Sequence, residues 1–135
     1  MKEISTYLTF DGNCRQAMEF YKKCLGGELF LMPVGESPVE APKEAKDRIM
    51  HASLKIGPLN LLAADRWLGM PYQHGDNFAI CIVPESIEET QRLFTALGEK
   101  GKVGMELQDT FWGAHFGMVQ DQFGIHWMFN FEKPK

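Results

Sequence analysis

The feature that most constrains the fold is an order of predicted elements that occurs twice along the chain. In each half a strand leads into a capped helix, and a further strand and a two-stranded hairpin follow. The first helix begins after Asn13, and the second begins after Ser86, 73 residues later. The hairpin glycines, Gly57 and Gly124, are 67 residues apart. The chain is therefore predicted to hold two strand–helix–strand–strand–strand modules.

Cap residues and apolar spacing support both helices. Asn13 precedes the first helix and Gly26 follows it, as a left-handed stop would. Ser86 with Glu89 reads as a capping box before the second helix, which Gly98 ends. Apolar or small side chains recur on one predicted stripe of each helix: Ala17, Phe20, Tyr21, Cys24 and Leu25 in the first, and Ile87, Thr90, Phe94 and Leu97 in the second.

Eight segments have the alternation of strands, and together with the two helices they predict an α+β fold. They are residues 4–10, 28–32, 49–56 and 59–64 in the first half, and 78–83, 103–107, 115–120 and 125–131 in the second. We expect a single domain over 1–135, with module one at 1–65, a linker at 65–77 and module two at 78–131. The loop at 33–48 holds three of the seven prolines and reads equally well as a mobile flap or as a solvated loop.

Composition restricts the classes of partner. Fourteen basic and eighteen acidic residues give a net charge of −4, so no basic face predicts nucleic acid or an anionic membrane as partner. The apolar runs are far shorter than a membrane span, and the first residues lack a secretory hydrophobic segment. The three cysteines show no CxxC spacing, which is typical of a reducing compartment. These observations predict a cytoplasmic location.

Several stretches are similar to one family over nearly the whole chain. They are residues 7–13, 19–21, 25–28, 50–52, 111–113 and 121–127. Through them the chain resembles the PhnB-like branch of the vicinal oxygen chelate superfamily, which includes glyoxalase, bleomycin-resistance and fosfomycin-resistance proteins and extradiol dioxygenases. The resemblance implies that paired modules curl their mixed sheets into a cup, often completed across a homodimer, with the ligand on the concave face.

Strand alternation predicts which side chains face that cup. His51 and Ser53 alternate with packing residues, as does His126 in the last strand, and Tyr7 shares its side of the first strand with Thr9. Histidine is the residue type best suited to proton transfer near neutral pH, so His51 is the candidate general acid or base. The candidate ligand-binding residues are Tyr7, Ser53, Trp67, Trp112, His115 and His126. Asp65 could pair with His51, although a role in starting the following turn is preferred.

The resemblance also implies where metal-using members place their ligands: near the start of each module's first strand and on each module's last strand. Counting along this chain places Ser5, Phe78, Leu61 and Met128 there. None of these is a usual ligand of a tight divalent site, so no metal and no cofactor are predicted. A different site built by His51, His115 and His126 stays open.

Two functions from different classes remain. The first is a metal-independent protein that binds a small molecule, and the second is an enzyme that acts on a small polar substrate through His51 with help from the Tyr7 hydroxyl. The chain has no phosphate-binding glycine loop and no glycine-rich first turn of a doubly wound sheet, so the ubiquinone methyltransferase label carried by some PhnB-like sequences is not adopted. A homodimer is expected, with the modules pairing either within a chain or across the dimer.

Overall fold

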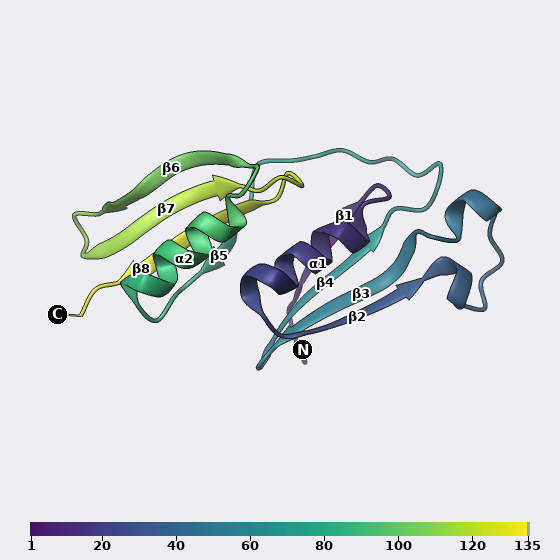
Figure 1. Cartoon of the computed structure of the whole chain (residues 1–135), viewed down its shortest axis with the longest axis horizontal. Coiled ribbons are helices and arrows are strands. Elements are labelled where there is room, and N and C mark those ends of the chain that lie inside the picture. Colours follow the sequence, from purple (N-terminus) through teal and green to yellow (C-terminus); the bar gives the residue numbers. More distant parts are fainter. Residues whose placement is uncertain (135) are drawn as a thin grey trace. The chain divides into compact units, whose positions relative to one another are not determined.

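A computed structural model describes residues 1–134, and these form two compact units. Unit 1 runs from Met1 to Gln73 and unit 2 begins at His74, so the boundary falls inside the predicted linker. Each unit holds one helix and one mixed four-stranded sheet (Figure 1). The prediction of an α+β fold with two such modules is confirmed. Among residues 1–134, no helix is long and apolar enough to cross a membrane.

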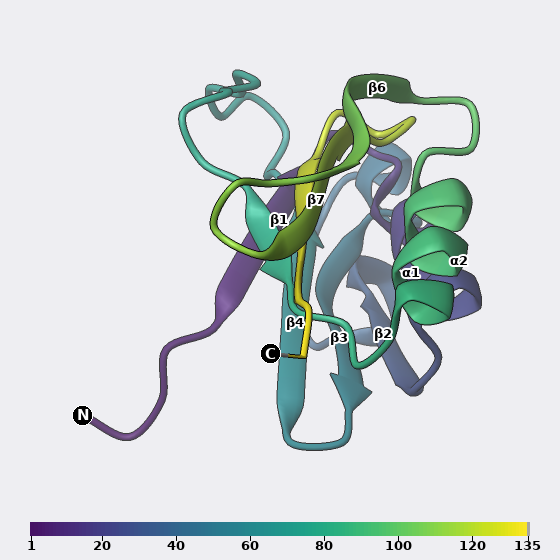
Figure 2. The same ribbon diagram turned by 90° about the vertical axis from the view of Figure 1, so that its left-hand side faces the viewer.

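Unit 1 places its first strand beside its last. The sheet order is β1-β4-β3-β2, in which β1 runs parallel to β4 and the other neighbours are antiparallel. Helix α1 packs against one face of the sheet, as the turned view in Figure 2 shows. The opposite face is called the open face of unit 1 below. The elements are β1 (Thr6–Phe10), α1 (Cys14–Leu25), β2 (Glu28–Pro33), the short 3₁₀ helices η1 (Val34–Glu36) and η2 (Lys43–Ala45), β3 (Ile49–Ile56) and β4 (Leu59–Asp65).

Unit 2 repeats this arrangement, with sheet order β5-β8-β7-β6 and β5 parallel to β8. Helix α2 packs against β7 and β8 on one face, which leaves an open face on the other side. The elements are β5 (Ile80–Ile82), α2 (Ile87–Leu97), β6 (Lys102–Asp109), β7 (Ala114–Gln120) and β8 (His126–Glu132). Two predicted strands are longer than the observed ones, because β1 begins only at Thr6 and β5 spans three residues.

The core of each unit lies between its helix and its sheet. In unit 1 the buried face of α1 is wider than the predicted stripe, because Cys14 and Met18 are buried as well, whereas Phe20 is only part-buried. In unit 2 the rings of Phe94 and Phe129 meet edge to face with centroids 5.6 Å apart. These apolar contacts are the main source of stability for such small units.

The two helices are capped differently. Ser86 Oγ accepts a 3.0 Å hydrogen bond from the Glu89 amide, which confirms the predicted cap of α2. The Glu89 carboxylate accepts from the amide of Glu85 rather than from that of Ser86. At α1 the Asn13 side chain makes no capping hydrogen bond with any described residue. The prediction that Asn13 caps α1 through its side chain is wrong. A residue at the end of β4 accepts the hydrogen bond from the start of the helix instead.

Candidate functional site

Asp65, at the end of β4, organises one end of unit 1. Its Oδ1 accepts hydrogen bonds from the amides of Gly12 at 2.7 Å and Cys14 at 3.1 Å, and its Oδ2 accepts from Ile49 at 2.8 Å. The carboxylate therefore caps α1 and fixes the start of β3. Our interpretation of Asp65 as a turn residue is wrong, because backbone amides outside the following turn donate to both of its oxygens. The alternative, that Asp65 pairs with His51, is not observed either.

The open face of unit 1 carries three of the predicted site residues. Strand pairing places Tyr7 and Ser53 on either side of Leu62 in one row, which Phe30 completes. His51 lies in the neighbouring row, with its ring centroid 6.4 Å from that of Tyr7 and 6.5 Å from that of Phe30. The structure thus brings Tyr7, His51 and Ser53 together on one face, as alternation predicts.

A pocket of about 240 Å³ lies at the end of this face, where β1 and β4 finish and β3 begins. Two predicted site residues, Tyr7 and Trp67, line it, and each is about half exposed. The two ends of the 33–48 loop meet at the pocket, since Val34 and Arg48 both line it and the amide of Val34 donates to the carbonyl of Arg48 at 2.8 Å. The remaining lining residues are Thr9, Val34, Ala45, Arg48, Ile49, Met50, Ala64, Asp65, Arg66 and Leu68.

This loop is not merely solvated, because part of it borders the pocket, and its mobility stays a prediction. Val34 and Ala45 are both buried and both border the pocket. Sequence reasoning missed them as pocket residues, because an irregular loop has no periodicity that shows which of its side chains turn inward.

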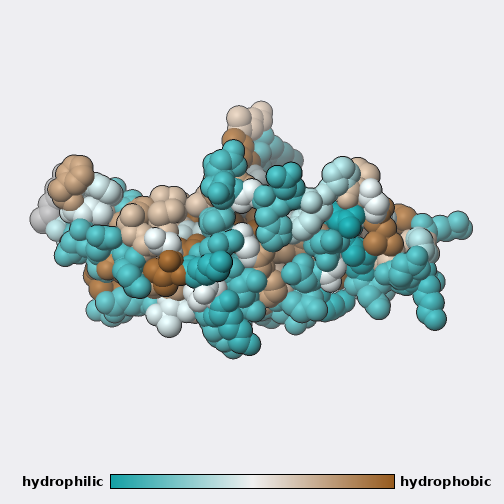
Figure 3. Space-filling model, turned by 90° about the horizontal axis from the view of Figure 1, so that it is seen from above, coloured by the Kyte–Doolittle hydropathy of each residue, from teal (hydrophilic) through white to brown (hydrophobic). Residues whose placement is uncertain are grey.

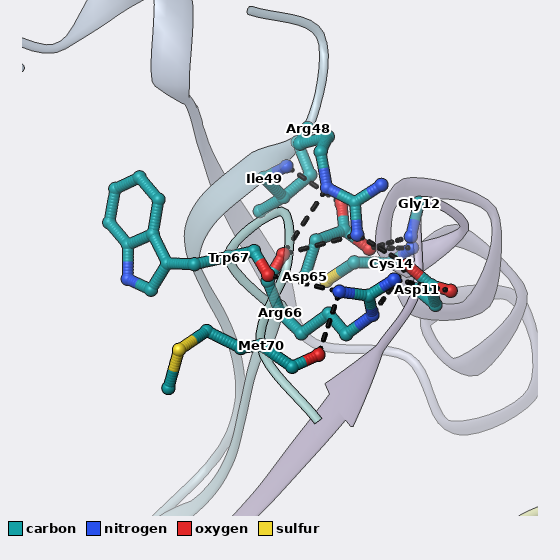
Figure 4. A network of polar contacts seen from close by, with 9 residues as sticks. All are labelled: Asp11, Gly12, Cys14, Arg48, Ile49, Asp65, Arg66, Trp67 and Met70. Atoms are coloured by element: carbon teal, nitrogen blue, oxygen red, sulfur yellow. Dashed lines mark hydrogen bonds and ion pairs between the residues drawn. The ribbon is translucent and has the colours of Figure 1, made fainter. Parts of the chain in front are cut away.

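Two arginines border the pocket, and both contact Asp11. Arg48 Nη2 lies 2.6 Å from Asp11 Oδ1. Arg66 Nε lies 3.0 Å from the same oxygen, within ion-pair distance but without hydrogen-bond geometry, and its Nη2 donates to Asp11 Oδ2 at 3.4 Å. Backbone carbonyls hold the guanidinium groups as well, because Arg48 donates to the carbonyl of Arg66, and Arg66 donates to those of Trp67 and Met70 (Figure 4).

These contacts affect the carboxyl of Asp11. The hydrogen bond from Arg48 lowers its pKa most, desolvation partly offsets this effect, and Arg66 lowers the pKa further. Asp11 is therefore ionised at neutral pH and balances the nearby cations. The adjacent Cys14 thiol shows the opposite shift, since burial and the charge of Asp65 raise its pKa to about 12.

The predicted site residues of unit 2 do not share one face. His126 pairs with Gln120 and His115 pairs with Phe131, so alternation along β7 and β8 places the two histidines on opposite faces of the sheet. His115 shares its face with Gly117, at which an added Cβ would meet the Phe94 side chain of α2 at 3.0 Å. The expectation that His115 lies on the open face with His126 is therefore wrong, because Phe131, the pairing partner of His115, lies five residues from His126 along β8, and an odd separation places two residues on opposite faces.

His115 belongs instead to a small ionic cluster. Its Nδ1 lies 2.9 Å from Asp109 Oδ1, and Lys133 Nζ lies 2.6 Å from the same oxygen. The hydrogen bond from Lys133 lowers the pKa of the Asp109 carboxyl most, and the hydrogen bond with His115 lowers it further. This arrangement is typical of a stabilising surface contact at the end of β6 and β7.

Trp112 is more than half exposed, in the turn before β7. Its ring centroid lies 5.0 Å from that of Phe111 and 6.3 Å from that of Phe116. The open face of the same unit carries a row that sequence reasoning missed, in which sulfur-bearing side chains occupy all four strands. Strand pairing joins them in the order Cys81, Met128, Met118 and Met105.

The positions at which related proteins hold a metal can be tested on the described residues. Leu61 is buried on the α1 side, so the prediction that it lies in the cup is wrong, and Leu62 occupies the open face instead. The two hairpins differ in length, so the same count from Gly57 and from Gly124 reaches opposite faces of the two sheets. Ile56 pairs with Leu59 across a two-residue turn, whereas the turn between β7 and β8 is longer. Within residues 1–134, no three His, Cys, Asp or Glu side chains form a group that could hold a metal ion.

Comparison with known proteins shows the same architecture elsewhere. Protein YjdN of Escherichia coli is 34% identical over 145 residues, which cover 98% of this chain and 97% of that protein. The crystal structure of PA1353 from Pseudomonas aeruginosa has a TM-score of 0.90 and 44% identity, and the match covers 99% of this chain and 100% of that one.

A PhnB protein from Bacillus cereus has the same fold, with a TM-score of 0.78 at 20% identity over 96% of this chain and 99% of that chain. The profile of the Glyoxalase/Bleomycin resistance protein/Dioxygenase superfamily matches residues 3–129. This match covers both units, with their helices, sheets and open faces. The chain therefore belongs to the Glyoxalase/Bleomycin resistance protein/Dioxygenase superfamily.

Proposed function

We propose that the chain binds a small organic molecule in the unit 1 pocket and does so without a metal ion. The observation that carries this proposal is the pocket itself, which opens beside Tyr7 at the end of the open face. Its volume of about 240 Å³ lies below the usual range of drug-sized sites, so the ligand is small. Trp67 offers an exposed aromatic surface, and the hydroxyls of Tyr7 and Thr9 offer hydrogen bonds.

The proposal of metal independence rests on the available side chains. Tyr7 and Leu62 are the open-face neighbours at the β1–β4 pairing, and Cys81 and Met128 are the corresponding neighbours in unit 2. Neither pair brings an imidazole or a carboxylate, and the single thiol of Cys81 is short of the three or four imidazole, carboxylate or thiolate ligands that a tight site for zinc, iron or manganese requires. Elemental analysis after dialysis should give well under one equivalent of these metals, and one tightly held equivalent would contradict the proposal.

Two measurements test the binding proposal. Native mass spectrometry of gently purified protein should detect mass additions that are lost on denaturation. Titration with 2-naphthamide, a small neutral aromatic probe, should perturb the indole NMR signal of Trp67 in wild type, and isothermal titration calorimetry should give the affinity of wild type and of each variant. Trp67→Ala should weaken binding about tenfold, since an aromatic contact is worth about 1.4 kcal/mol. Leu59→Ala also removes an exposed apolar side chain, but outside the pocket, and should leave affinity within about twofold. Equal binding by all three proteins would contradict the proposed site.

A second candidate is an enzyme of the superfamily that uses His51 as general acid or base. The contact between His51 and Tyr7 favours it, because Tyr7 also lines the pocket and could present a bound molecule to the imidazole. Chemical change of a copurified ligand by wild-type protein but not by His51→Ala would establish this function. Unaltered ligand recovered from both proteins would leave the binding function alone.

We also propose that the protein is a homodimer. Several large apolar side chains are exposed in each unit, and Phe111 is 98% exposed. Figure 3 shows apolar groups, in brown, between the hydrophilic groups of the visible face. Apolar surface of this extent is typical of a protein that buries it against a partner. Light scattering should give about 31 kDa, twice the chain mass of 15.4 kDa, and a value of 15.4 kDa at micromolar concentration would exclude the dimer.

A further inference from the structure

The unit 1 pocket has a cationic border whose charge is already balanced. Arg48 and Arg66 both line it, and Asp11, outside the lining, contacts both guanidinium groups. The carboxylate of Asp65 also borders the pocket, but backbone amides occupy its two oxygens. Two cations thus face two anions, and a ligand with a net charge would meet no unbalanced partner.

Backbone carbonyls hold the two guanidinium groups in addition to Asp11. Arg48 donates twice to the carbonyl of Arg66, at 3.2 Å and 3.1 Å. Arg66 donates to the carbonyls of Trp67 at 3.1 Å and Met70 at 2.8 Å. These carbonyls are neutral, so they orient the arginines without cancelling their charge. Asp11 itself follows β1, its side chain is 38% exposed, and its carboxylate contacts both arginines.

We propose that Asp11 determines the charge selectivity of the pocket, so that neutral molecules bind and organic anions are excluded. This inference rests on the proposed binding function and specifies its ligand class. A carboxylate that enters the pocket loses hydration and must compete with Asp11 for both arginines, whereas a neutral amide of the same shape loses much less. Without Asp11 the two positioned guanidinium groups form a site for an anion.

A matched pair of probes and four proteins, namely wild type and three variants, test this proposal. The probes are 2-naphthamide and 2-naphthoate, which share one shape and differ in charge, and binding is followed through the Trp67 indole signal. Wild-type protein should prefer the amide at least tenfold. In Asp11→Asn the affinity for naphthoate should rise about tenfold, which equals one charge-assisted hydrogen bond of about 1.4 kcal/mol, and should fall again with added salt. The amide should change by less than about twofold.

Glu19→Gln is the control, because it removes the same charge from an exposed position of α1 outside the pocket. It should behave as wild type with both probes. Asp11→Glu keeps the negative charge and should keep the preference for the amide. The preference of wild type for the amide over naphthoate also tests the proposal without any variant, in case Asp11→Asn folds poorly. This preference should not change with added salt.

The outcomes separate this inference from the proposed function. Equal binding of both probes by wild type, or no gain of naphthoate binding in folded Asp11→Asn, overturns the role of Asp11 and leaves the binding function in place. Salt-sensitive naphthoate binding by Asp11→Asn alone, with no binding by wild type, supports the role of Asp11 and contradicts the proposed function. No binding by any of the proteins overturns both.

Discussion

The two units have the same order of elements, but they fix their helices by different means. In unit 2 the cap of α2 comes from Ser86, immediately before the helix, with Glu89 three residues later. In unit 1 the cap of α1 comes from Asp65, more than fifty residues away along the chain. A local cap forms whenever its helix forms, whereas the cap from Asp65 requires β4 to be in place beside β1.

This difference connects stability to the pocket in unit 1. Asp65 borders the pocket while it holds the starts of α1 and β3, so helix, strand and pocket wall depend on one carboxylate. Unit 2 has a buried acid with another task, at the opposite end of its sheet. In the turn between β7 and β8, Asp121 accepts from the Trp127 indole at 2.8 Å and from the amides of Phe123 and Ile125. The same fold thus uses a buried aspartate for long-range assembly in one unit and for a hairpin in the other.

The cysteines of the two units should differ most in reactivity. Burial and the charge of Asp65 raise the pKa of Cys14 to about 12, against a usual value of 9.0, so its thiolate fraction near neutral pH falls about a thousandfold. Cys81 in unit 2 is exposed. Alkylation of native protein should therefore label Cys81 quickly and Cys14 extremely slowly, as peptide mass spectrometry can measure. Rapid labelling of Cys14 in folded protein would contradict the buried contact with Asp65, and Cys81→Ser should remove the fast phase.

Asp65→Ala should cause the largest loss of stability among single substitutions at the caps. It leaves three backbone amides without their acceptor, two of them in buried contacts, which should lower the free energy of unfolding by about 3 kcal/mol. Asp65→Asn is the matched control, because its one carbonyl oxygen can still accept from Gly12 and Cys14 while its NH₂ group faces the Ile49 amide. It should lose about half as much in denaturant unfolding. Equal losses, or a loss under about 1 kcal/mol in Asp65→Ala, would argue against the long-range cap.

Ser86→Ala should have a smaller effect, confined to unit 2. The substitution removes one hydrogen bond to the Glu89 amide at an accessible helix end, which typically costs about 1 kcal/mol. Hydrogen exchange should show faster exchange in the first turn of α2 and unchanged protection of α1. If Asp65→Ala and Ser86→Ala gave equal losses, the contrast between local and long-range capping would be lost.

The contrast also explains what the sequence could predict. The two modules, both helices and the edges of most strands follow from local signals, namely caps, glycines and alternation. Alternation also placed Tyr7, His51 and Ser53 on one face, since β3 and its hairpin are regular. The role of Asp65 had no such signal, because a carboxylate that caps a distant helix looks like a turn residue in the sequence.

The wrong predictions for unit 2 and for the hairpins have one cause, the alternation of side chains between the two faces of a strand. One residue more or less in a turn moves every following side chain to the other face, which is why Leu61 was placed on the wrong face and why His115 and His126 are separated. The Asp11 contacts were missed for a further reason. Arg48 lies in the loop before β3 and Arg66 in the segment after β4, and only the folded chain brings them to one carboxylate.

The smallest expected effects are those of pH on two exposed carboxylates, Asp11 in unit 1 and Asp109 in unit 2, each of which contacts two basic side chains. The pKa of Asp11 is lowered chiefly by Arg48, and that of Asp109 chiefly by Lys133, from a usual value of 3.8. A carboxyl with a lowered pKa in the folded state stabilises the fold above its usual pKa, and this contribution disappears as the pH falls through the lowered value. Because both groups are exposed, solvent screens most of the effect.

The stability difference between wild type and Asp11→Asn, measured by denaturant unfolding, should therefore be present at neutral pH and vanish in strong acid. The same should hold for Asp109→Asn. A difference that persists unchanged into strong acid would mean that the substitutions act through packing rather than through charge.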